Sequence, residues 1–233
     1  MRLFKIAALV TTALAMLAVT AVALASSQFK QTSNVTLTAG KAGQSTGFKA
    51  AIVSSDPGEL GGKPQALKTL TLTLPSATKF NFKSKALTLC TAGDTEIKGT
   101  GGAVCPAKSK IGSGTAEANG YPAIPLIPET ATAYAGNGNI IFLLAPKGPA
   151  GAPLVLHGVV SANKVTTAVP TITFGGVSIV ITGLNLTVNK VGSGKSAFIT
   201  AGKCSGRKFS VKSSFIYYTG APLTLSSASK CSK

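Results

Sequence analysis

The sequence predicts an all-β protein, specifically an antiparallel β-sandwich of the immunoglobulin-like or jelly-roll-like kind. Apolar and polar residues alternate with period two through many short segments that are rich in Thr, Val and Ile. Gly, Pro, Asn and Ser separate these segments, as expected of turns. No segment beyond residue 25 has the apolar stripe of a long helix. Roughly a dozen short strands with regular turns favour two stacked antiparallel sheets.

The expected strands begin near residue 33, where SNVTLTA and FKAAIVSS form the first two. LKTLTLTLP follows, with Leu70, Leu72 and Leu74 alternating against threonines, as in a strand that is buried on one face. The remaining expected strands are KFNF, KALTLC, GTAEA, ATAYA, NIIFLLA, PLVLHGVVSA, GVSIVITGLNLTV, SAFITAG, KFSVKSSFIYY and PLTLSSAS.

One short helix is expected between Cys90 and Cys105, in the segment TAGDTEIKG. Thr91 can cap this helix, with Asp94 three residues later. The segment YPAIPLIPET is expected to be an edge strand or an extended connector, because proline lacks the amide donor that a central strand needs. Residues 26–233 are therefore expected to form one sandwich domain. The alternative is two packed sub-sheets divided near residues 118–130.

Residues 1–25 have the layout of a secretory signal peptide. Arg2 and Lys5 precede an uncharged apolar run, which ends in the small-x-small pattern Ala23-Leu24-Ala25. The sequence therefore predicts export to the extracellular space or the cell envelope. The apolar run is also long enough to span a bilayer, so an uncleaved N-terminal anchor, contacting the membrane, is the alternative.

The four cysteines, an even number, are expected to form disulfides in an exported protein. Three pairings are possible. The pairs Cys90–Cys105 and Cys204–Cys231 are favoured, because each is local and lies in its own half of the chain. Each bridge would stabilise the fold by about 3–4 kcal/mol through loop-closure entropy. A metal site is not expected, because there is no C-x-x-C pair and the single histidine, His157, is distant in the sequence.

The chain is strongly basic, with a formal net charge of +17 at pH 7. Cleavage after residue 25 would remove Arg2 and Lys5, leaving 21 of the 23 basic side chains, all six acids and a charge of +15. No acidic side chain occurs from Thr130 to Lys233, whereas ten basic residues do. Such a chain is expected to attract anionic cell-envelope polymers, such as teichoic-type chains or acidic polysaccharide. Specific nucleic-acid binding is not expected, because the lysines are scattered and stacking aromatics are few.

The stretch NKVGSGKS, residues 189–196, differs by one residue from the phosphate-binding loop G-x-x-x-x-G-K-[ST], because Asn189 replaces the first glycine. Such a loop needs a following helix and an acid that helps to hold magnesium. Here the residues that follow, SAFITAGKC, resemble a strand, and no acid occurs after residue 129. A hairpin turn built on Gly192, Ser193 and Gly194 is the expected structure. No nucleotide or other cofactor is predicted.

The run CPAKSKIGSGTA, residues 105–116, has two interpretations. The backbone amides around Gly112 and Gly114 can form an anion-binding nest, with Lys108 and Lys110 nearby. The alternative is a disulfide-anchored turn that leads into a strand, in which proline fixes the backbone and glycines permit bends.

No catalytic set is apparent in the sequence. A serine triad needs a base and an orienting acid, and the only histidine, His157, lies in the middle of a predicted strand. Asp94 and Glu96 are too close in the sequence to face each other across a sugar substrate. A non-enzymatic structural or binding role is the leading hypothesis. A polyanion-binding module is the second and a hydrolase the third.

Three stretches stand out together: LPSATKFNFKSKALTLC, CPAKSKIGSGTA and KSAFITAGKCSGRKFSVKSSFIYYTG, with Cys231 as the last cysteine. In these, the chain resembles a family of exported proteins of high-GC actinobacteria, over roughly residues 66–231. The C-P-x-x-S-x-I-G-x-G run is the most specific part. Members often carry Trp soon after the third cysteine, where this chain has Arg207-Lys208-Phe209. The resemblance implies an exported β domain with two cysteine pairs and supplies no catalytic residue.

Overall fold

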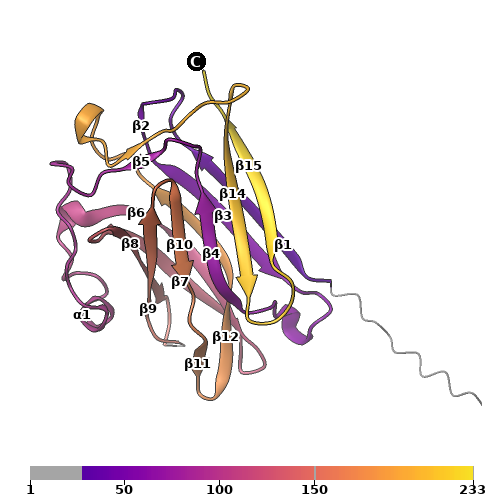
Figure 1. The fold of residues 1–233 in the computed structure, drawn as a ribbon. Coiled ribbons are helices and arrows are strands. Elements are labelled where there is room, and N and C mark those ends of the chain that lie inside the picture. Colours follow the sequence, from indigo (N-terminus) through magenta and orange to yellow (C-terminus); the bar gives the residue numbers. More distant parts are fainter. Residues whose placement is uncertain (1–27, 150, 233) are drawn as a thin grey trace, which may run out of the picture.

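A computed structural model describes residues 28–149 and 151–232, so that the predicted signal peptide, residues 1–25, lies outside the described residues. The main body is one antiparallel sheet that curls nearly into a barrel (Figure 1). The order of its strands is β1 (Lys30–Leu37), β3 (Phe48–Ser55), β12 (Val177–Val188), β6 (Lys110–Gly120), β7 (Ile124–Ala135), β8 (Asn139–Pro146), β9 (Leu154–Ser161), β10 (Lys164–Ala168), β4 (Leu67–Thr73), β14 (Lys208–Tyr217) and β15 (Leu223–Lys230).

The smaller elements lie at the ends and on the outside of this sheet. They are β11 (Ile172–Phe174), which pairs only with β12, the three-stranded sheet β2 (Ser45–Thr46), β13 (Ile199–Thr200) and β5 (Lys79–Phe80), the helix α1 (Asp94–Gly99), and short 3₁₀ turns at Leu60–Gly62, Ala107–Ser109 and Gly194–Ser196.

The expected all-β class is confirmed, but the expected β-sandwich is wrong, because one continuous sheet replaces two stacked sheets. Alternation buries one face of each strand in either architecture, so the sequence pattern is the same for both. Irregular registers in the β6–β7, β6–β12 and β4–β14 pairs bend the sheet. Gly114 contributes, because a Cβ atom there would lie only 1.9 Å from the carbonyl oxygen of Asn185 on β12. Small residues thus let β6 and β12 approach closely.

Serine hydroxyls join the first and last strands of the sheet. β1 and β15 share no backbone ladder in the described structure. Instead, the Ser227 hydroxyl accepts a hydrogen bond from the Val35 amide at 3.0 Å and donates one to the Val35 carbonyl at 2.8 Å. The Ser229 hydroxyl accepts from the Leu37 amide at 3.3 Å. These contacts, called the seam below, close the barrel between strands that run in the same direction.

The three-stranded sheet β2–β13–β5 covers one end of the barrel, where β1, β4 and β12 finish (Figure 1). We call this the capped end and the opposite one the far end. Phe198, just before β13, is fully buried and packs edge-on against Phe80 and Phe82, with ring centroids 6.0 Å and 5.3 Å away. These rings belong to the same apolar cluster as the barrel interior, so the cap and the barrel share one core.

The predicted helix between Cys90 and Cys105 is confirmed as α1, but its cap differs from the expectation. Gly93, rather than Thr91, occupies the N-cap position. Its backbone amide donates to the Glu96 carboxylate at 3.1 Å. Ile97 is fully buried and anchors α1 to a second apolar cluster on the outer face of β7, β8 and β9.

The proline-rich segment enters a strand, β7, that is central in the strand order, so the connector interpretation is wrong. β7 pairs with β6 along its length but meets β8 only from Glu129 onward. Pro125 falls in the register shift of the β6–β7 pair, and Pro128 lies just before the β8 ladder, where its carbonyl still accepts from the Lys147 amide at 2.9 Å. Proline is tolerated at such irregular or edge-like positions. Residues 118–130 form the β6–β7 hairpin in the middle of the sheet.

Both favoured disulfides are present. Cys90 pairs with Cys105 and Cys204 with Cys231, with Cα–Cα distances of 4.9 Å and 6.1 Å. Two disulfides indicate an oxidising compartment. Among the described residues, no helix is both long and apolar enough to cross a bilayer.

Candidate functional site

The capped end carries most of the basic side chains of the described structure. Strand starts, strand ends and the cap loops all contribute to it, because antiparallel pairing brings alternate turns to one end of the sheet. All of these side chains are exposed. The basic residues of the capped end are Lys41, Lys49, Lys79, Lys83, Lys85, Lys108, Lys110, Lys164, Lys190, Lys195, Lys203, Arg207, Lys208 and Lys230.

Hydrogen bonds hold these segments together. The Asn81 side-chain amide donates to the Lys195 carbonyl at 3.2 Å. The backbone amide of Lys203 donates to the Ser76 carbonyl at 2.7 Å, and that of Cys231 donates to the Arg207 carbonyl at 3.0 Å. The Cys204–Cys231 disulfide ties the same loop to the end of β15. The basic side chains therefore project from a fixed framework.

No acidic group neutralises the capped end in the part of the chain that the structure describes. Among the described residues, the only contact between a basic side chain and a carboxylate is that of His157 with Asp94, on the outside of the barrel. Lys208 and Lys230 lie directly opposite each other in the β14–β15 ladder, an arrangement in which like charges repel. An anion bound between such side chains would relieve the repulsion.

The acids lie elsewhere in the fold. Asp56 and Glu59 follow β3 at the far end, and Glu117 and Glu129 lie in the far-end parts of β6 and β7. The remaining two acids of the sequence, Asp94 and Glu96, belong to α1. The capped end therefore carries a large positive charge, whereas the far end holds acids together with the basic residues Lys30, Lys63, Lys68 and Lys147.

The four residues of the predicted anion nest lie in β6 and in the 3₁₀ turn just before it. Gly112 and Gly114 lie inside β6, where they pair with both β7 and β12. Their backbone is extended strand and not the turn that a nest requires. Lys110 begins β6 and Lys108 lies in the preceding 3₁₀ turn, and both are exposed next to the capped end. Anion binding at these four residues stays a prediction, and the two lysines are the part that joins the basic surface.

The GSGKS segment forms a loop between different sheets. β12, which precedes it, pairs with β3, β6 and β11, whereas β13, which follows, pairs with β2 and β5. The expected hairpin is therefore wrong, although the glycines serve as turn residues: Gly192 and Gly194 have φ of 70° and 52°. A short strand follows the loop, where a phosphate-binding loop would have a helix.

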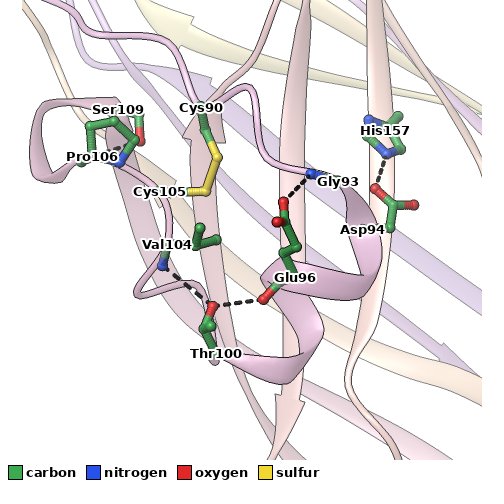
Figure 2. The surroundings of a disulfide bond; sticks show 10 residues. All are labelled: Cys90, Gly93, Asp94, Glu96, Thr100, Val104, Cys105, Pro106, Ser109 and His157. Atoms are coloured by element: carbon green, nitrogen blue, oxygen red, sulfur yellow. Dashed lines mark hydrogen bonds and ion pairs between the residues drawn. A yellow bond between two sulfur atoms is a disulfide. The ribbon is translucent and has the colours of Figure 1, made fainter.

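His157 lies on the outer face of β9 and contacts α1, as Figure 2 shows. Its Nε2 atom is 2.9 Å from Asp94 Oδ1, and its Nδ1 atom is 3.0 Å from the Asn139 side-chain amide. A carboxylate only accepts hydrogen bonds, so Nε2 carries the proton and Nδ1 accepts from Asn139. No hydroxyl or thiol of the described residues hydrogen-bonds to this imidazole. The arrangement fastens α1 to the barrel.

The sequence shows the excess of basic residues but not the surface that they share. The lysines are spread evenly along the chain and gather only because the strand order brings distant loops together. Comparison with known proteins gives no match: no family model, no curated protein and no solved structure is similar to this chain. The resemblance to exported actinobacterial proteins therefore stays a prediction.

Proposed function

We propose that this is an exported, non-enzymatic binding protein of the cell envelope that attaches to acidic polymers through its capped end. The observation that carries the proposal is the group of exposed, unpaired basic side chains on one rigid end of the barrel. The apolar run at residues 6–25 and the two disulfides support export.

The charge arrangement favours a polymer over a single small anion. The basic groups come from many separate segments and cover the end of the barrel without converging on one pocket. A flexible chain of phosphates or carboxylates can contact several such groups at once. The release of its counterions then provides the affinity and makes it strongly dependent on salt.

The experiment measures the binding of the disulfide-bonded mature protein to an immobilised glycerol-phosphate polymer and to an acidic polysaccharide. Affinity should fall steeply between about 50 and 200 mM salt. The triple substitution Lys79→Gln, Lys195→Gln and Lys203→Gln should weaken binding and lower the slope of log affinity against log salt by up to about 3, near 1 for each lost contact.

A matched control keeps the net charge equal but changes other parts of the surface. Lys30 and Lys147 lie at the far end and Lys98 on α1, and all three are exposed. The triple substitution of these residues to Gln should leave the salt slope nearly unchanged. Equal loss of binding in both triple variants would show that net charge, and not the capped end, governs attachment. Binding that persists unchanged at high salt would rule out the electrostatic mechanism.

A further inference from the structure

The interior of the barrel holds an apolar cavity of about 80 Å³ that is partly open. Its walls are almost entirely aliphatic or aromatic, and Phe142, Leu144 and Leu156 are among them. A cavity of about 150 Å³ holds benzene, so this one suits a hydrocarbon body of a few carbon atoms.

A second cavity of about 40 Å³ lies next to it and contains one carboxyl group, that of Glu129. Ile181 lines both cavities. On the inward face of β7, Glu129 lines the smaller cavity and Ala131 the larger one. On β9, Leu154 likewise lines the smaller cavity and Leu156 the larger. Residues two apart in a strand are about 7 Å apart, so a short chain can reach from one cavity to the other.

Glu129 has no partner within the described structure. Its side chain is only 7% exposed, and its Oε2 atom is buried without a hydrogen bond. Its other neighbours in the cavity are Ala118, Ile127, Ile172, Phe174 and Ile179, and no second titratable side chain lines the space. Lys147, on the loop after β8, is exposed and lies outside the lining. A buried carboxylate without a partner is costly, and a cationic ligand would remove that cost.

We propose that the barrel interior binds a small primary amine, whose ammonium group pairs with Glu129 and whose short hydrocarbon chain occupies the apolar cavity. A metal ion is a poorer fit, because no group of three or more His, Cys, Asp or Glu residues occurs among the described residues. The proposal does not depend on polymer attachment, because it concerns the interior and the far end of the barrel.

The test uses n-butylamine as the probe, with n-butanol and butyrate as neutral and anionic molecules of similar size. The mature, disulfide-bonded protein is titrated and followed by amide NMR shifts. Burial raises the pKa of Glu129 from 4.5 to about 7. At a pH of about 9 the carboxylate is therefore ionised, and butylamine should bind at least tenfold more tightly than butanol, with butyrate weakest. The shifted amides should include those of Ala131, Leu154 and Ile181.

Two substitutions distinguish amine binding at Glu129 from a general attraction of the amine to carboxylates of the protein. Glu129→Gln should remove the preference for the amine over butanol and retain butanol binding, which also shows that the cavity is intact. Glu117→Gln removes an exposed carboxylate on the neighbouring strand β6 and should change nothing. Near pH 5 the wild-type protein should behave like Glu129→Gln. Equal binding of amine and alcohol by the wild-type protein, equal amine binding by both variants, or the absence of amine binding would each overturn the proposal.

Discussion

The Ser227 hydroxyl holds both backbone groups of Val35, accepting from the amide at 3.0 Å and donating to the carbonyl at 2.8 Å. One side chain thus replaces two ladder hydrogen bonds between β1 and β15, whose only backbone pairing in the described structure is the Lys41–Ser232 bridge just beyond them. Val35 is fully buried, so its backbone groups have no ready access to water as an alternative.

Replacing this hydroxyl should weaken the seam. Ser227→Ala leaves an amide and a carbonyl of β1 without partners, and we expect a loss of about 1–3 kcal/mol in the free energy of unfolding. Denaturant titration measures this loss. Ser226→Ala is the matched control, because Ser226 is exposed on the neighbouring position and should change stability by less than about 0.5 kcal/mol. Equal effects in the two variants would contradict the role given to the seam.

The close approach of β6 and β12 predicts a severe effect at Gly114. A methyl group there would meet the Asn185 carbonyl oxygen at 1.9 Å, and backbone cannot move aside as a flexible side chain can. Gly114→Ala should therefore destabilise the fold by about 3 kcal/mol or more, or prevent folding. Gly40→Ala, at a position with no atom within 4 Å of the added carbon, should fold normally, as circular dichroism and thermal melting can show.

Helix α1 should depend on apolar packing far more than on its ion pair. Ile97 is fully buried, and Ile97→Ala should cost about 2–5 kcal/mol. The side chains of His157 and Asp94 are 39% and 48% exposed, so Asp94→Asn should cost less than about 1 kcal/mol. Equilibrium unfolding of the two variants compares them directly. A larger effect from Asp94→Asn would mean that the ion pair, rather than Ile97, holds the helix.

The burial of Glu129 predicts a pH dependence of stability. Its pKa rises from 4.5 to about 7 on folding, so between these values the folded protein binds more protons than the unfolded chain. The contribution of this group to the free energy of unfolding should therefore decrease by about 3 kcal/mol as pH rises through this range, and then stay level.

The difference between wild-type protein and Glu129→Gln isolates that contribution. Denaturant midpoints measured at several pH values should show the variant gaining stability relative to wild type from about pH 4.5 to about pH 7. Glu117→Gln should show no such trend, since Glu117 is exposed. A constant difference across the range would mean that Glu129 ionises as freely in the fold as in the unfolded chain.

Local patterns in the sequence predicted local structure well. Alternation located most strands, for example β3 over Phe48–Ser55, and short separation predicted both disulfides. Where the pattern was weak, prediction failed: KALTLC forms no strand, SAFITAG contributes only β13, and β10 and β11 were missed. Strand length depends on the partners that a segment meets, which its own residues do not specify.

Features that arise from strand order were not predictable from local patterns. A curled sheet and a stacked pair have the same alternation, so the sandwich was an equally consistent interpretation. The basic surface required knowledge of which loops share an end. Glu129 had a recognisable signal, since it occupies an inward position in the series with Ala131, Ala133 and Ala135, where an acid is unexpected.

The concentration of basic groups at the capped end gives the molecule a permanent electric dipole moment. Near a negatively charged surface the field would turn the protein before contact, so that the lysine-rich capped end leads. A tethered molecule would then present its far end to the surrounding medium in every copy. The molecules would then attach in one orientation rather than at random. This preference should weaken as added salt shortens the Debye length.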